Sequence, residues 1–97
     1  MPPAQADPEI TGRVLPCAAS VAFGQRLRKL RGQHGLSQDG LARRTDIHPT
    51  AIARMERGAR EPRLRTILRL AQGLDIQPGM LLDELTYAQA TAPRART

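Results

Sequence analysis

Three polar side chains that could contact nucleic acid are spaced along one face of a short predicted helix. Thr50, Arg54 and Arg57 follow one another at i, i+4 and i+7, which places them on the same side of an α-helix. Ile52 and Met55 fall on the opposite side, where they can pack against the rest of the chain. Arginine can donate two hydrogen bonds to a guanine edge, and both arginine and threonine can donate to phosphate. This face could therefore contact bases, with Arg54 the main candidate, or only the phosphate backbone.

The stretch from Ser37 to Gly58 contains the signals that would place this face on a rigid two-helix unit. Ser37 is a good N-cap for a first helix, and Asp46 can adopt the left-handed conformation that a sharp turn requires. Pro49, which follows His48, is favoured at the first position of a second helix, and Gly58 is a C-terminal stop. The residues expected to pack inward from the first helix and the turn are Leu41, Ala42, Thr45 and Ile47. A polar, arginine-bearing second helix is typical of the helix-turn-helix, whose second helix enters the DNA major groove.

The distribution of charge agrees with a nucleic-acid partner. The 97-residue chain carries a formal net charge of +6, and residues 26–69 hold eleven arginines and one lysine against four acidic residues. The flanks are net acidic, so the basic charge lies on the two-helix unit and its neighbours, as is typical of a nucleic-acid-binding surface. Charge alone would equally fit a generic arginine-rich surface. The chain has one Phe and one Tyr, which argues against a single-strand binder that stacks bases on aromatic side chains.

The composition also argues against several other classes of protein. A single cysteine, Cys17, allows no intramolecular disulfide, and His34 and His48 have no cysteine or acidic partner at metal-ligand spacing. There is no nucleophile motif and no glycine-rich phosphate loop, so we expect no enzyme activity, no metal and no cofactor. The chain lacks an apolar run of about 20 residues and a signal peptide. We therefore expect a cytoplasmic protein, associated with the nucleoid through DNA binding and without a membrane partner.

Three further helices should pack around the two-helix unit, and 97 residues suffice for one domain. The first is expected over about residues 21–34, the second over 64–72, and the third from Pro78. Their expected inward residues are Phe23, Leu27 and Leu30; then Leu64, Ile67, Leu68 and Ala71; then Met80, Leu81, Leu82 and Leu85. Proline-rich residues before the first helix and the Ala/Thr/Pro/Arg residues after Tyr87 are expected to be flexible.

Six short segments between residues 23 and 85 share a known pattern in combination. They are R-L-R-K-L-R at 26–31, G-L-S-Q at 35–38, L-A-R-R at 41–44, I-A-R-M-E-R-G at 52–58, L-R-T-I-L-R-L-A at 64–71 and G-L-D-I at 73–76. Together they resemble the Cro/C1-type (XRE-family) helix-turn-helix DNA-binding domain. The resemblance implies an all-α fold: a compact five-helix lambda-repressor-like domain over residues 20–86, with the helix-turn-helix at 37–56. It leaves a flexible N-terminal arm at 1–19 and a flexible C-terminal tail at 87–97.

The resemblance also implies roles for individual residues. Gln38 would contact a phosphate, Thr50 and Arg54 would face bases or nearby phosphates, and Arg57 would hold the DNA backbone. Arg31 and Glu56 would form a buried ion pair between the first helix and the second motif helix. The full set of residues expected to contact double-stranded DNA is Ser37, Gln38, His48, Pro49, Thr50, Arg54, Arg57, Arg60 and Arg63.

Three residues depart from the commonest pattern of this family. Asp46 stands where glycine or asparagine is usual, and Gly40 stands where a helix-forming residue is usual. Pro49 replaces a polar residue that often contacts bases, so it either starts the helix or contacts a thymine methyl group. We expect Gly40 on the outer side of its helix, near Arg43 and Arg44, where alanine would be more stable.

The resemblance favours a sequence-specific transcriptional regulator: a repressor that acts as a homodimer on a palindromic operator, with the helix opened by Pro78 as the interface. The alternative is an antitoxin that binds a toxin protein and autoregulates its operon, and co-purification of a toxin would separate the two. A third possibility, a pure protein-interaction module, would be expected to lack basic residues on the second motif helix. Arg54 and Arg57 argue against that module.

Overall fold

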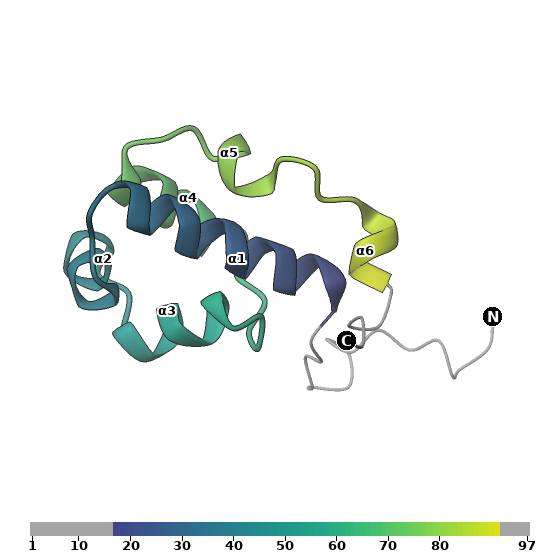
Figure 1. The fold of residues 1–97 in the computed structure, drawn as a ribbon, viewed down its shortest axis with the longest axis horizontal. Helices are drawn as coiled ribbons and strands as arrows, with labels where there is room; N and C mark the ends of the chain where they lie inside the picture. The colour runs from purple at the N-terminus through teal and green to yellow at the C-terminus, as the bar shows by residue number, and fades with distance from the viewer. Residues whose placement is uncertain (1–16, 92–97) are drawn as a thin grey trace.

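The computed structural model describes residues 17–91, which form six helices around one core (Figure 1). In chain order they are α1 (Ala18–Gln33), α2 (Gln38–Thr45), α3 (Pro49–Glu56), α4 (Leu64–Leu74), α5 (Gly79–Leu82) and α6 (Tyr87–Thr91). The predicted all-α, lambda-repressor-like class is confirmed. Most of the arm predicted for residues 1–19 and of the tail predicted for 87–97 lies outside the described residues. No helix within residues 17–91 is both long and apolar enough to cross a membrane.

Helix α1 begins three residues earlier than predicted because Cys17 and Ser20 form a capping box. The Ser20 amide donates to the Cys17 Sγ at 3.4 Å, and the Cys17 amide donates to the Ser20 Oγ at 3.0 Å. Two donors at the helix start are thereby satisfied, and helix propagation from Ala18 is favoured. The Ser20 hydroxyl also donates to the carbonyl of Gly58 at 3.3 Å. The start of α1 is therefore tied to the loop that follows α3, and residues 17–19 belong to the folded domain rather than to the arm.

The local signals of the two-helix unit produce the expected geometry. The hydroxyl of Ser37 accepts from the Gly40 amide at 2.9 Å and caps α2. Asp46 ends α2 in the left-handed conformation (φ 57°, ψ 33°), Pro49 occupies the first turn of α3, and Gly58 follows α3 with φ 73°. The predicted inward residues of α2 and α3 are buried, and Ile47 is half-buried against the core.

The predicted inward face of α4 is wrong by a rotation of about 60°. Leu64 and Leu68 were expected inside, but their side chains are 71% and 48% exposed. Leu70 and Leu74 are buried in their place, next to Ala71 and the half-buried Ile67. The difference follows from the contact with α2: Gly73 lies against Thr45, where a Cβ would overlap the Thr45 methyl group unless that side chain moved. Packing α2 on the Gly73 side turns the buried face toward residues 70 and 74.

The chain after α4 also differs from the prediction. Pro78 precedes α5 as expected, but Leu81 is the one fully buried side chain of that helix, and Met80 and Leu82 are exposed. Residues from Tyr87 were expected to fray, yet Tyr87–Thr91 forms α6, which packs against α1. A second capping box explains this helix: the Thr86 amide donates to the Gln89 Oε1 at 2.9 Å, and the Gln89 amide donates to the Thr86 Oγ1 at 3.3 Å.

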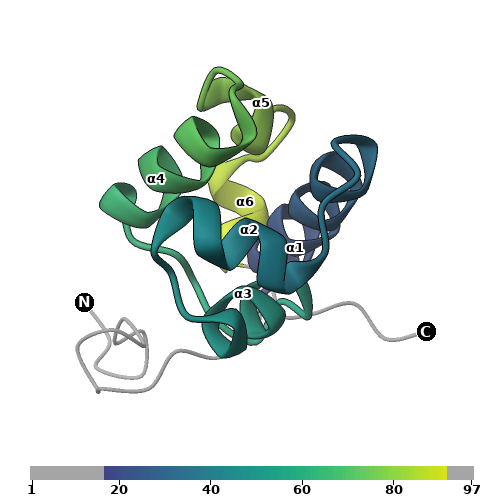
Figure 2. The ribbon, with the colours of Figure 1, turned by 90° about the vertical axis from the view of Figure 1, so that its left-hand side faces the viewer.

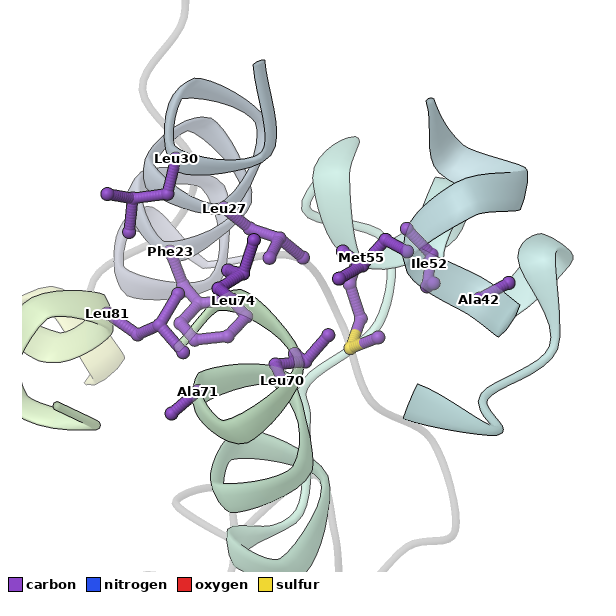
Figure 3. Packing of buried hydrophobic residues seen from close by; sticks show 11 residues of the cluster. Phe23, Leu27, Leu30, Ala42, Ile52, Met55, Leu70, Ala71, Leu74 and Leu81 are labelled. Carbon is purple, nitrogen blue, oxygen red and sulfur yellow. The ribbon is translucent and has the colours of Figure 1, made fainter. Parts of the chain in front are cut away.

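The core forms between α1, α3, α4 and α5, whose buried apolar side chains point toward one another in Figure 3. Apolar side chains from these helices and from α2 are fully or nearly fully buried: Phe23, Leu27, Leu30, Leu41, Ala42, Ile52, Met55, Leu70, Ala71, Leu74 and Leu81. Gly24 lies at the closest approach of α1 to α3, where a Cβ would overlap the Met55 carbonyl oxygen and lie 2.7 Å from that of Glu56. The core therefore sets the position of α3 through backbone contact as well as side-chain packing.

Candidate nucleic-acid interface

The outer face of α3 is polar and accessible. Thr50, Arg54 and Arg57 are exposed, whereas Ile52 and Met55 on the opposite side are buried. Figure 2 shows α3 along one edge of the fold, with α2 beside it. An eight-residue helix held on its apolar side with its polar side free has the geometry needed to enter a major groove.

The first turn of α3 is fixed by its own cap. His48 is the N-cap residue, and its Nδ1 accepts a hydrogen bond from the Thr50 amide at 3.1 Å. In the neutral ring this arrangement leaves the proton on Nε2, which can then donate to an acceptor outside the protein. Pro49 is half-buried at the first helical position, in agreement with a role in starting the helix. His48 thus orients the amide end of α3 and presents a free donor beside Thr50.

The ion pair expected between Arg31 and Glu56 is present and shielded from solvent. The Arg31 Nε donates to the Glu56 Oε2 at 2.6 Å, and its NH2 donates to Oε1 at 2.9 Å, a bidentate arrangement. The side chains are 15% and 3% exposed. The hydrogen bonds with Glu56 raise the pKa of Arg31, so the guanidinium stays charged. A third donation, from the Arg31 NH1 to the Leu36 carbonyl at 2.8 Å, ties the pair to the segment before α2.

Gln38 joins this network. Its Nε2 donates to the Glu56 Oε1 at 3.0 Å, so the side chain predicted to contact a phosphate is held in place by a residue of α3. The Gln38 side chain has further hydrogen-bonding capacity, because a primary amide has two N–H donors and one carbonyl acceptor. Ser37, next to it, is exposed and occupied as the helix cap. The start of α2 is therefore fixed relative to α3 by one shared carboxylate.

A shallow hollow lies between α1, α2 and α3 beside this network. Its lining residues are Arg28, Arg31, Gln38, Ala53, Glu56 and Arg57. Four predicted residues, Gln38, Arg57, Arg31 and Glu56, are thus brought together, and Ala53 of α3 lines the same hollow. Arg28 was not among the residues predicted to contact DNA. Its spacing of i, i+3 from Arg31 was the signal that could have placed it here.

Arg60 and Arg63 lie on the connection between α3 and α4. Both are exposed, and Arg63 occupies the N-cap position of α4 without a side-chain cap hydrogen bond. Neither lines the hollow. The structure therefore divides the predicted DNA-contact residues into the face of α3, the cluster around the hollow, and this exposed connection.

Comparisons with known proteins agree with this geometry. A family model described as a helix-turn-helix domain matches residues 22–85. The control protein C.BamHI of Bacillus amyloliquefaciens is 40% identical over 65 residues, which make up 66% of this chain and 80% of that protein. The crystal structure of the restriction-modification controller protein C.AhdI from Aeromonas hydrophila is 47% identical, with a TM-score of 0.63 over 64% of this chain and 94% of that chain. The clp gene regulator ClgR from Corynebacterium glutamicum has a TM-score of 0.66 at 24% identity, over 74% of this chain and 77% of its own, which shows a shared fold.

Proposed function

Because the chain belongs to the Cro/C1-type helix-turn-helix family of DNA-binding transcriptional regulators, we propose that α3 enters the major groove of an operator and that Arg54 contacts a base there. The observation that carries this proposal is the exposed face of α3, fixed at both ends by its caps and by the Arg31–Glu56 pair. Arg54 lies near the middle of that face, where a long side chain can reach a guanine edge. We assign Arg57, which is the C-cap residue of α3 and lines the hollow, to a contact with the phosphate backbone.

The regulated genes are proposed from the relatives whose function is named. One of them is described as a control protein and another as a restriction-modification controller protein, and this chain covers 80% and 94% of their lengths. We propose that the chain represses an operon of the same kind from within the cytoplasm, by occupying an operator. The alternative antitoxin function stays a prediction, and co-purification of a toxin with the tagged chain would support it.

A second copy of the chain is the proposed partner on the operator. One eight-residue recognition helix spans few base pairs, and paired recognition helices contact half-sites about 34 Å apart. Helix α5 leaves Met80 and Leu82 exposed on a four-residue helix, so it offers apolar surface that a second copy would cover. The proposed homodimer accordingly pairs through α5 on a palindromic site.

Selection of bound duplexes from a random DNA library, followed by titration of two variants, tests the proposal. Arg54→Ala should weaken binding to the selected duplex by about 1–3 kcal/mol and relax the preference at one base position. Arg57→Ala should weaken binding to the selected duplex and to a random duplex by the same factor. Arg65→Ala, an exposed α4 arginine, is the charge-matched control. Equal losses for Arg54→Ala on both duplexes would show that Arg54 does not contact a base.

A further inference from the structure

We propose that Arg28 of α1 is a further DNA-contact residue, and that it binds the same backbone phosphate as Gln38 and Arg57 in the hollow between α1, α2 and α3. This inference rests on the proposed function, since it assigns α1 a part in the same complex. The hollow adjoins α3 through Ala53 and Arg57, and the first residue of α2 lines it as well. A helix inserted into the major groove has a sugar–phosphate strand passing on each side of it. The hollow lies where α3 meets α1 and α2. In the proposed complex, one of the two sugar–phosphate strands runs past this hollow.

The charge of the hollow favours an anion despite the carboxylate in it. Both carboxylate oxygens of Glu56 already accept hydrogen bonds from Arg31, and Oε1 accepts another from Gln38. Arg31 therefore neutralises Glu56, and the carboxylate is 3% exposed. Arg28 and Arg57 remain as two positive charges that line the same hollow. The positive end of the α2 dipole is at Gln38 and adds to them.

Both remaining arginines are free to reach a ligand. Arg28 and Arg57 are exposed, and within residues 17–91 neither forms an ion pair or a side-chain hydrogen bond. Ala53, which lines the same hollow, is small, so its side chain takes up little room there. Guanidinium groups donate to phosphate in a bidentate manner, and two of them in one hollow can hold one phosphate. The Arg31–Glu56 pair in the same hollow is held in position, because Arg31 donates two hydrogen bonds to Glu56 and one to the Leu36 carbonyl.

A salt titration separates Arg28 from an ordinary surface charge. Each phosphate neutralised by a cationic side chain contributes about −0.9 to the slope of log K against log salt concentration. Arg28→Ala should therefore flatten the slope by about 0.9. The loss of affinity of this variant relative to the unmodified chain should then be about 3.5-fold smaller at 200 mM salt than at about 50 mM. The effect should be the same on a random-sequence duplex and on a duplex selected from the library. Lys29→Ala is the matched control, because Lys29 is exposed on the same helix and does not line the hollow.

Each outcome decides the inference. A flattened slope for Arg28→Ala, restored by Arg28→Lys and absent in Lys29→Ala, supports a phosphate contact. A slope equal to that of the unmodified chain, or one changed equally by both alanine variants, overturns it. Urea midpoints of the variants identify a loss of folding, and Arg28→Gln provides a second uncharged variant if Arg28→Ala is destabilised. Failure of the unmodified chain to bind either duplex would instead refute the proposed function itself.

Discussion

Replacing Gly24 by alanine should destabilise the domain, although alanine is the better helix former. Gly24 lies inside α1, where exchange for alanine would by itself stabilise the helix by about 1 kcal/mol. At this site, however, the new Cβ would overlap the carbonyl oxygen of Met55 and lie 2.7 Å from that of Glu56. Both are backbone atoms at the end of α3, so no side-chain rotation can relieve the overlap. Helix α1 would have to move away from α3 by about 1 Å to restore an ordinary contact.

The size of the effect follows from the cost of overpacking. Forcing an extra methyl group into a packed interface typically costs about 1–3 kcal/mol. A domain of this size has a free energy of unfolding of about 4–11 kcal/mol, so the loss is a sizeable fraction of the total. With a urea m-value of about 1–1.5 kcal/mol/M, the midpoint of Gly24→Ala should fall by about 0.7–3 M. The DNA affinity should fall as well, because α3 itself is displaced.

Gly32→Ala is the internal control for this experiment. Gly32 lies in the same helix, is exposed, and a Cβ there would meet nothing within 4 Å. The substitution should therefore raise the free energy of unfolding by about 0.5–1 kcal/mol. Urea unfolding followed by circular dichroism measures both variants under one condition. If Gly24→Ala were as stable as Gly32→Ala, the close approach of α1 to α3 would be refuted.

Three further predictions follow from other contacts. In a double-mutant cycle on Arg31 and Glu56, removal of either partner should cost about 3–5 kcal/mol and the coupling should exceed about 1 kcal/mol, measured by urea unfolding. Gly40→Ala should raise the free energy of unfolding by less than the full helix-propensity difference of about 1 kcal/mol, because the new Cβ would lie 3.2 Å from the hydroxyl of Ser37. A urea midpoint below that of the unmodified chain would show that the Ser37 hydroxyl cannot move aside. Exchange of both Met80 and Leu82 for serine should shift the chain from dimer to monomer in analytical sedimentation. Exchange of Leu64 and Leu68, the exposed leucines of α4, for serine should leave it a dimer. The opposite pattern would place the dimer interface on α4.

The sequence predicted those elements whose signals are local. Ser37, Asp46 and Pro49 each act on one helix end through its own backbone, so their residue types were enough to place α2 and α3. The ion pair between Arg31 and Glu56 was expected from the family resemblance, which matches both residues. The capping boxes at Cys17–Ser20 and Thr86–Gln89 were also local signals. They were missed because a cysteine is an uncommon cap and because the second box lies in a segment without apolar periodicity.

Features set by packing between helices could not be predicted from the sequence alone. Residues 64–74 contain enough leucines to form two overlapping apolar stripes, and both satisfy the 3.6-residue period. The approach of α2 at Gly73 decides between them, and that approach exists only in the folded chain. Similarly, helical periodicity puts Gly24 at the edge of the predicted apolar face and Gly32 on the opposite side, but only the folded chain brings the backbone of α3 against Gly24.

The contacts of Glu56 connect the stability of this domain to the position of its DNA-contact residues. Its carbonyl oxygen lies against Gly24 of α1, and its carboxylate is bound by Arg31 of α1 and Gln38 of α2. The two α1 residues are seven positions apart, or about 10 Å along the helix, so α1 holds the end of α3 at two separate points. A single point would leave α3 free to pivot, whereas two points fix its direction. Because Gln38 is bound to the same carboxylate, the start of α2, which we propose contacts a phosphate, is positioned together with α3. Substitution of Glu56 should therefore weaken operator and random-duplex binding even under conditions where the chain remains folded, and a folded Glu56→Gln variant with unchanged affinity for both would refute this coupling.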